Sequence, residues 1–275
     1  MVIEHSPPGL AGSVEATRPG PLPCQVPLLE AAGLAALAAL ARERALFAFD
    51  FDGTLAGIRA RPGEVRVAPA LARRMAALAR ARPVAIVTGR RIGDVRTRLG
   101  FEPAFIVGNH GAEDETDPAG SERLATALET LRAVIMSREL ELEVAGVLVE
   151  DKRQSIALHF RNAPDRSGAS ALIEEVLDLR GPEVQVFGGK LVYNAVADGA
   201  PDKAHAVQRL LVRAGAKTAF FAGDDINDEP VFECAEPGWV TVRVGREHRP
   251  SRARFSLESP RTMPGVIDHV LASLG

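Results

Sequence analysis

The chain of 275 residues has few cysteine, lysine and aromatic side chains. Its two cysteines, Cys24 and Cys234, lie far apart in sequence and fit neither a disulfide framework nor the spacing of a zinc site. Acidic and basic residues nearly balance, with a formal net charge of −3, so the chain lacks the excess of positive charge that is typical of nucleic-acid-binding proteins. No apolar run approaches the length of a membrane span. We therefore expect a soluble monomer without a nucleic-acid or membrane partner.

The N-terminal segment differs from the rest in composition. Residues 1–27 are rich in proline, glycine and small polar residues, and they lack the basic start and apolar core of a signal peptide. We expect this segment to be a disordered tail and the protein to be cytoplasmic. The remaining length is sufficient for one large domain or two smaller ones.

The most informative segment is an apolar strand that runs into two aspartates. Residues 46–49 supply the apolar, aromatic run of a buried central strand, which is followed by Asp50, Asp52 and, at a sharp turn, Gly53. Ligands bind at the carboxyl ends of the strands in open α/β sheets. Two carboxylates at such an end are suited to a cation and a phosphate, because Mg²⁺ prefers oxygen ligands. The alternative is a polar turn with two solvated aspartates.

A second acidic cluster follows another short apolar strand, at residues 218–222. We expect Asp224 to be a direct metal ligand, with Asp225 and Asp228 either coordinating through water or orienting the ligands. The cluster also fits the acidic first turn of a following helix, where carboxylates interact favourably with the helix dipole. Both interpretations can hold for the same carboxylates.

Two further segments supply groups that a phosphate site needs. Residues 84–87 form a β-rich run that ends in Thr88, Gly89 and Arg90, which offer a hydroxyl and backbone N–H groups to a phosphoryl oxygen. Lys203, one of four lysines, begins a predicted helix and is suited to hold a phosphate and neutralise charge in the transition state. Taken alone, Lys203 is equally a solvated lysine in a first helical turn.

The order of the predicted elements indicates an α/β fold with a parallel sheet and right-handed crossovers. The expected core strands are residues 46–49, 84–87, 104–107, 218–222, 239–244 and 254–256. The expected core helices are residues 28–41, 69–80, 92–99, 203–214 and 264–274.

The pattern changes between the third and fourth core strands. There we expect helices at 120–138 and 166–179 and strands at 146–152, 155–162, 184–187 and 191–197. Strands joined by short turns are antiparallel, so residues 113–198 are predicted to form a smaller α/β cap domain inserted into a core of residues 28–112 and 199–275. Hinges are expected near 111–114 and 198–201.

The predicted cap strands carry many polar residues. Strand alternation puts Glu150 and Lys152 on one face, and His159 and Arg161 together on one face of the next strand. A face of mixed charges suits a ligand with many hydroxyl groups. The alternative is an exposed sheet face with cross-strand ion pairs, which contribute little energy.

The motifs together resemble those of the haloacid dehalogenase-like phosphatases. The segment Asp-Phe-Asp-Gly-Thr-Leu at 50–55 is similar to their first signature at every position. The cap segment 150–161, Gly-Asn-His-Gly at 108–111 and the acidic cluster at 223–229 narrow the resemblance to the trehalose-6-phosphate phosphatases, over roughly residue 45 to the C-terminus. The resemblance implies a Rossmann-like parallel-sheet core with an inserted cap, and a Mg²⁺-dependent phosphatase that acts through an aspartyl-phosphate intermediate.

The resemblance also assigns residues by matching position. It makes Asp50 the nucleophile and Asp52 the general acid and base. The implied catalytic residues are Asp50, Asp52, Thr88 and Lys203. The implied metal ligands are Asp50, Asp52 and Asp224. The implied substrate residues are Gly89, Arg90, His110, Glu150, Lys152, Arg161 and Asn194.

The sequence departs from the family's motifs at three positions, so it indicates the chemistry more firmly than the substrate. Asn194 stands where the family's Glu-x-Arg-Pro motif has glutamate, Val196 replaces the arginine, and Asn227 replaces a usual threonine. A phosphatase of another sugar phosphate with the same cap is therefore the first alternative. The second is a catalytically silent phosphosugar-binding domain that regulates a trehalose-6-phosphate synthase as partner, against which the intact aspartates argue. A phosphosugar mutase would need the phosphoaspartate protected from water.

Overall fold

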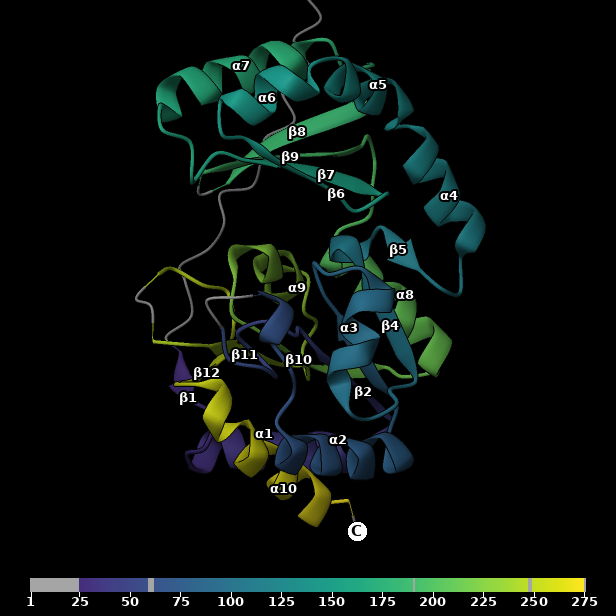
Figure 1. Ribbon diagram of the computed structural model, residues 1–275. Helices are drawn as coiled ribbons and strands as arrows, with labels where there is room; N and C mark the ends of the chain where they lie inside the picture. The colour runs from purple at the N-terminus through teal and green to yellow at the C-terminus, as the bar shows by residue number, and fades with distance from the viewer. Residues whose placement is uncertain (1–24, 59–61, 190, 247–248, 275) are drawn as a thin grey trace, which may run out of the picture.

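A computed structural model describes residues 25–58, 62–189, 191–246 and 249–274, arranged as a main body and a smaller unit (Figure 1). The main body contains an eight-stranded sheet. All neighbouring strands pair in parallel except β4 and β5, which are antiparallel. In spatial order the strands are β1 (Val26–Pro27), β12 (Phe255–Leu257), β11 (Val240–Val244), β10 (Thr218–Gly223), β2 (Ala45–Phe49), β3 (Val84–Val87), β4 (Phe105–Gly108) and β5 (Glu113–Asp114).

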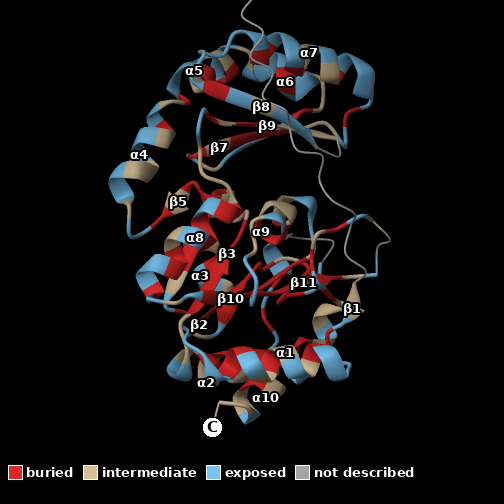
Figure 2. Cartoon of the chain, turned by 180° about the vertical axis from the view of Figure 1, so that it is seen from behind, coloured by how far each residue is buried: buried red, intermediate tan, exposed pale blue. Residues whose placement is uncertain are grey.

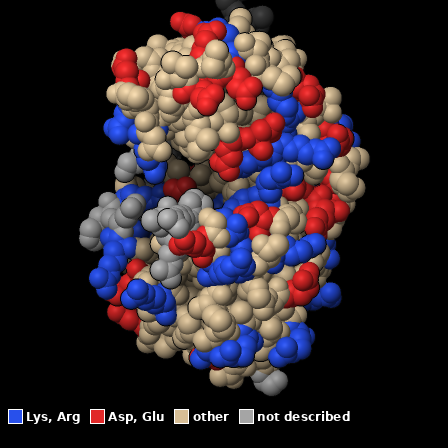
Figure 3. Space-filling model, in the orientation of Figure 1, with Lys and Arg blue, Asp and Glu red and all other residues tan. Residues whose placement is uncertain are grey.

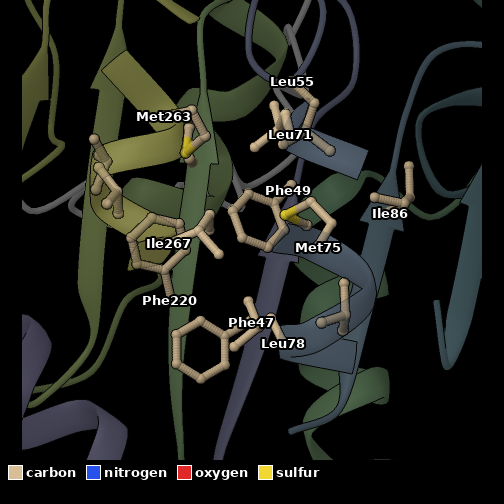
Figure 4. Close-up of a cluster of buried hydrophobic side chains, with 14 of the residues drawn as sticks. Phe47, Phe49, Leu55, Leu71, Met75, Leu78, Ile86, Phe220, Met263 and Ile267 are labelled. Carbon is tan, nitrogen blue, oxygen red and sulfur yellow. The ribbon is translucent and has the colours of Figure 1, made fainter. Parts of the chain in front are cut away.

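The two central strands are apolar on both sides, as expected of a parallel sheet covered on both faces. In β2 every residue is buried, and alternate side chains enter different clusters: Phe47 and Phe49 pack on one face of the sheet and Leu46 on the other. In β10, Phe220 joins the first cluster and Phe221 the second. Figure 4 shows the first cluster, in which Phe47, Phe49 and Phe220 meet apolar side chains of neighbouring helices.

Helices cover both faces of this sheet. One layer is formed by α1 (Ala31–Arg42), α2 (Pro69–Ala81) and α10 (Met263–Ala272), and Figure 2 shows their buried side directed toward the sheet. The other face is covered by α8 (Lys203–Ala214) and α9 (Glu229–Glu233), while α3 (Ile92–Leu99) connects β3 and β4. Short 3-10 turns complete the main body: η1 (Pro62–Glu64), η2 (Asn109–Gly111), η3 (Ile226–Asp228) and η4 (Pro260–Thr262).

The smaller unit has its own sheet and its own apolar cluster, built from residues 128–195. Its four antiparallel strands are, in spatial order, β6 (Leu148–Asp151), β7 (Ser155–His159), β9 (Val192–Ala197) and β8 (Val184–Gly189). Its helices are α4 (Pro118–Thr126), α5 (Glu129–Ser137), α6 (Glu139–Val144) and α7 (Arg166–Asp178). Because α5, α6 and α7 lie on the far side of this sheet, its other face is directed toward the main body (Figure 1).

The fold class predicted from the sequence is confirmed, and several boundaries are corrected. Val26 and Pro27, assigned to a disordered tail, form β1 beside β12, and residues 1–24 of that tail lie outside the described residues. The helix expected at 120–138 is divided into α4 and α5, because α4 contacts β5 whereas α5 contacts α7. The first expected hinge contains β5, which is paired with β4. Within the described ranges, no helix combines the length and apolarity needed to cross a membrane.

Candidate active site

The carboxyl ends of four parallel strands meet at one edge of the main sheet, where they surround a cavity of about 680 Å³. Asp50 follows β2, Asp224 follows β10, and Gly89 and His110 follow β3 and β4. All four residues line the cavity. It is also lined by Asp52, Gly53, Gly57, Ile58, Arg161, Lys203, Asp225, Val244, Gly245 and Pro260. Figure 3 shows a hollow between the smaller unit and the main body, with acidic side chains inside it.

A buried ion network lies at the base of this cavity. The Nζ atom of Lys203 is 2.8 Å from Oδ1 of Asp50 and 2.7 Å from Oδ1 of Asp228. Lys203 and Asp50 are 2% and 5% exposed, and Asp228 is fully buried. The Oδ2 atom of Asp228 also accepts a hydrogen bond from the backbone N–H of Asp225 (2.9 Å). Both oxygens of Asp228 are therefore engaged, so this side chain holds Lys203 in place beside Asp50.

Burial and mutual repulsion shift the pKa values of two acidic groups upward. Burial raises the pKa of Asp50 to about 7, although Lys203 opposes the shift. Burial, together with the charges of Asp50 and Asp228, raises the pKa of Asp224 to about 8. Burial alone would lower the pKa of Lys203, but the two carboxylates beside it outweigh burial and raise it. Lys203 therefore stays charged, and its single positive charge does not balance the three carboxyl groups around it.

The acidic side chains fit a divalent cation. Carboxylate oxygens of Asp50, Asp224 and Asp228 all lie within 4.8 Å of one another. A Cβ atom on Gly53, whose φ is +75°, would stand 1.9 Å from Oδ2 of Asp224, so the absence of a side chain at Gly53 allows this approach. An all-oxygen donor set with net negative charge suits a hard cation such as Mg²⁺.

The loop after β3 offers a seat for a phosphate, and His110 packs against it. Thr88 is buried, and its hydroxyl accepts a hydrogen bond from the backbone N–H of Arg90 (3.2 Å). A Cβ atom on Gly89 would lie 2.3 Å from Cε1 of His110, so the imidazole ring occupies the space beside the glycine. Burial lowers the pKa of His110 to about 3, and the charges of Lys203 and Lys152 act in the same direction. His110 is therefore neutral at physiological pH.

The second aspartate of the first motif is held by an arginine. The guanidinium of Arg90 donates to both carboxylate oxygens of Asp52, at 2.6 and 2.7 Å, and also pairs with Asp94 at 2.9 Å. This bidentate pair fixes the direction of the Asp52 carboxylate. Asp52 lies at the cavity, but its carboxylate is not part of the acidic group described above. Its assignment as a metal ligand stays a prediction, as does that of Arg90 as a substrate residue.

Four predicted substrate residues belong to the smaller unit, and only Arg161 among them lines the cavity. Arg161 follows the end of β7 at His159, so its predicted place within a strand is wrong. Glu150 Oε2 is 3.1 Å from His159 Nε2 and 3.7 Å from Lys152 Nζ. The pairing of Glu150 with Ala157, and of Ala157 with Asn194, puts Glu150 and Asn194 in one row on the face directed toward the main body. Their roles as substrate residues stay predictions.

Some contacts that shape the site could not be predicted from the sequence. The Nη2 atom of Arg249 donates to the backbone oxygen of Asp224 (2.7 Å), from a position 25 residues further along the chain. Val244, Gly245 and Pro260 line the cavity from the C-terminal part of the chain. Between the main body and the smaller unit, Asn109 and Gln154 form a hydrogen bond. Such contacts depend on how distant segments meet, so only the structure locates them.

Comparison with known proteins places this site in a family. A trehalose-phosphate phosphatase of Mycobacterium marinum is 33% identical, in an alignment that covers 82% of this chain and 62% of the relative. A trehalose-phosphate phosphatase of Mycobacterium tuberculosis is 32% identical over 90% of this chain and 66% of its own length. The chain thus spans less than two thirds of either relative.

The fold is similar to solved structures. The C-terminal domain of C. albicans trehalose-6-phosphate phosphatase matches with a TM-score of 0.69 and 20% identity, over 90% of this chain and 98% of that one. This similarity concerns the fold. The sequence model of the trehalose-phosphatase family matches residues 48–261, which include every strand of the smaller unit and each strand end at the cavity. The chain therefore belongs to the trehalose-phosphatase family.

Proposed function

We propose that this chain is a Mg²⁺-dependent phosphatase that hydrolyses trehalose 6-phosphate through an aspartyl-phosphate on Asp50. One observation carries the proposal. A buried carboxylate, Asp50, is paired with a buried Lys203 at the base of a cavity whose rim includes Arg161 of the smaller unit. Membership of the trehalose-phosphatase family supports this reading of the geometry.

The proposed reaction has two displacements at phosphorus. An oxygen of Asp50 forms a bond to phosphorus as the bond to the sugar 6-oxygen breaks, and Asp52 gives its proton to the leaving oxygen. Asp52, now a carboxylate, then takes a proton from water as that water attacks the phosphoaspartate, which releases phosphate and restores Asp50. Arg90 directs the carboxylate form of Asp52 that the second step uses, and one of its two hydrogen bonds must be released for Asp52 to carry the proton of the first step. Lys203 places its positive charge beside the oxygens that gain negative charge.

A divalent metal fits beside Asp50. Asp50 and Asp224 would hold it, with Asp228 fixing Lys203 next to them. The bound cation would supply positive charge that reduces the repulsion between these carboxylates and a phosphate dianion. We propose Mg²⁺ because the donor atoms are carboxylate oxygens.

We propose that the smaller unit acts as a cap that recognises the sugar. Its polar face carries Glu150, Lys152 and Asn194 and is directed toward the main body, and Arg161 already lines the cavity. Charged and amide groups on one face can exchange hydrogen bonds with several hydroxyl groups. Asn194 keeps one carbonyl acceptor where the family has a carboxylate, so a phosphatase of another sugar phosphate is the second candidate. A catalytically silent domain fits poorly with the Asp50–Lys203 pair.

The decisive experiment compares kcat/KM for trehalose 6-phosphate, glucose 6-phosphate and an aryl phosphate, with Mg²⁺ and the full chain. We expect trehalose 6-phosphate to be preferred over both, because only it reaches the cap face with a second sugar ring. Asp50→Asn serves as the inactive control for contaminating phosphatase. Equal values for the three substrates would remove the trehalose 6-phosphate assignment and favour a broader sugar phosphatase. A monomeric state and a synthase partner stay predictions.

A further inference from the structure

The smaller unit reaches the main body at a buried hydrogen-bonded contact. The Nδ2 atom of Asn109, in η2, donates to Oε1 of Gln154 (2.9 Å) and to the backbone oxygen of Lys152 (3.0 Å). Asn109 is 2% exposed and Gln154 is 5% exposed. Both acceptors belong to the turn between β6 and β7, which contains Lys152, one of the predicted sugar residues. We call this the Asn109–Gln154 contact.

The same asparagine is tied to the loop that would hold the phosphate. Its backbone N–H donates to the oxygen of Arg90 (3.0 Å), and the N–H of His110 donates to the oxygen of Thr88 (2.9 Å). The ring of His110 fills the space beside Gly89. The loop after β3 and the turn after β4 therefore form one hydrogen-bonded unit, and a force on the Asn109 side chain acts on both segments.

The backbone at this contact is unusual. Asn109, His110 and Arg153 have φ values of 47°, 58° and 73°, in the left-handed region. They are three of the four residues other than glycine with positive φ among the described residues. This conformation costs energy for side chains with a Cβ atom and persists only where surrounding contacts impose it. Its presence on both sides of the contact indicates that the contact holds each turn in place.

We propose that Asn109 and Gln154 form a latch. It fixes the proposed phosphate-binding loop, residues 88–90, when the smaller unit (the cap) closes onto the main body (the core). Asn109 and Gln154 are positioning residues, because neither lines the cavity within the described part of the chain. Cap closure and ordering of residues 88–90 are then one event. A substrate whose sugar draws the cap toward the core gains an ordered phosphate site, whereas a small aryl phosphate does not. This substrate dependence rests on the proposed function.

A double-mutant cycle tests the latch. Gln154→Met keeps the length of the side chain and removes the side-chain acceptor while the backbone oxygen of Lys152 stays, and Asn109→Gly removes the donor while allowing positive φ. We expect each change to lower kcat/KM for trehalose 6-phosphate about five- to tenfold, the range of one lost hydrogen bond. The double variant should be no slower than the slower single variant. Activity toward an aryl phosphate should stay within about twofold for Gln154→Met, since that substrate makes no use of the cap.

The control is Ser170→Ala, which removes a hydrogen bond to Tyr193 (3.0 Å) inside the smaller unit. It should change neither activity. Additive losses in the double variant, or an equal loss toward the aryl phosphate, would overturn the latch.

Hydrogen exchange provides a readout that needs no turnover. Both without ligand and with Mg²⁺, orthovanadate and trehalose present, Gln154→Met should speed exchange in the peptide that contains the N–H groups of Asn109 and His110, whereas Ser170→Ala should not. If the wild-type protein hydrolyses no sugar phosphate, the proposed function fails, and this measurement still decides the latch. Unchanged exchange in Gln154→Met would reject it.

Discussion

At the scale of single residues, the main feature of the site is a group of charged side chains that are buried away from water. Lys203 interacts with two carboxylates at under 3 Å, and each of the three side chains is at most 7% exposed. Removing one member of such a set leaves an unpaired buried charge, which typically costs about 3–5 kcal/mol. The geometry therefore depends on all of Asp50, Lys203 and Asp228, although only Asp50 is proposed to bond to phosphorus.

Asp50→Asn is expected to abolish turnover while the protein stays folded. The amide is nearly the same size as the carboxylate and can still contact Lys203, but it cannot attack phosphorus. Phosphate release and circular dichroism measure the two effects, with the wild-type protein as the reference, and mass spectrometry excludes deamidation. More than a trace of the wild-type activity in the intact Asp50→Asn variant would contradict a phosphoaspartate.

Metal binding is expected to depend on pH. The pKa values are about 7 for Asp50 and about 8 for Asp224. In the metal-free fold, these groups therefore hold protons at pH values at which a free carboxyl group has lost its proton. Mg²⁺ and protons compete for these oxygens, so Mg²⁺ affinity should rise from about pH 6 to about pH 8 and binding should release protons. Calorimetry in buffers of different ionisation enthalpy measures both. An affinity that is constant across this range would show that neither group loses a proton on binding.

Asp224→Ala should weaken Mg²⁺ binding and lower the rate. The exposed Asp225 supplies the matched control, since its carboxylate lies outside the acidic group and Asp225→Asn should bind the metal nearly as wild type does. Full activity in excess EDTA would contradict the metal requirement.

At the scale of elements, the strand ends decide where the chemistry is placed. Asp50, Thr88, His110 and Asp224 follow four strands of one sheet, and because these strands are parallel their carboxyl ends lie at the same edge. The smaller sheet contributes a polar face that is separate from its apolar cluster. In the proposed function, the chemistry therefore belongs to the main sheet and sugar recognition to the smaller sheet.

Substitutions on the smaller unit should affect the sugar phosphate selectively. Losing a hydrogen bond to a charged group costs about 1.5–3 kcal/mol, so Glu150→Gln, Lys152→Met and Arg161→Met should each raise KM for trehalose 6-phosphate by about tenfold or more. Values for an aryl phosphate should change little. Arg138→Met, which loses ion pairs to Glu141 and Glu175 between helices, is the control. An equal effect on both substrates would argue against sugar recognition.

Elements with strong local signals could be predicted from the sequence, and those defined by distant pairing could not. Residues 84–87, 92–99 and 203–214 were predicted with the bounds that the structure has, because apolar periodicity is clear and Gly100 and Gly215 end the two helices in the left-handed conformation. In contrast, β1 and β5 each have two residues and exist only through pairing with strands elsewhere. The carboxylates at strand ends were predicted for the same local reason. The contacts of Arg249 with Asp224 and of Gln154 with Asn109 were not, because they join segments that are distant in the sequence.

At the scale of the whole molecule, two parts meet around the cavity and are joined at the residues after β4 and before α8. Asp114, in β5, is held by Arg209 at 2.9 Å and by Arg213 at 2.7 Å, both from α8. The first connection is therefore anchored to the main body as far as Asp114. Rotation of the smaller unit would begin beyond this point.

Ligand binding is expected to compact the protein. In the proposed reaction, substrate enters between the two parts and bulk water is excluded apart from the attacking molecule, so the open form should predominate without ligand and the closed form with it. Small-angle scattering with and without Mg²⁺, orthovanadate and trehalose measures the radius of gyration. An unchanged profile at saturating ligand would contradict a mobile cap.

The cluster of buried carboxylates has a consequence for evolution as well as for chemistry. Asp50 and Asp228 share one lysine, and Asp224 lies beside them, so repulsion among the three carboxyl groups lowers the stability of the fold until a cation binds. A cation present at roughly one hundred times its Kd would restore about 2.7 kcal/mol by mass action. Asp224→Asn should accordingly raise the Tm of the metal-free protein and abolish the further rise that Mg²⁺ gives the wild type. Selection for stability alone would remove this aspartate, so we expect its presence to reflect selection for the metal-dependent activity proposed above.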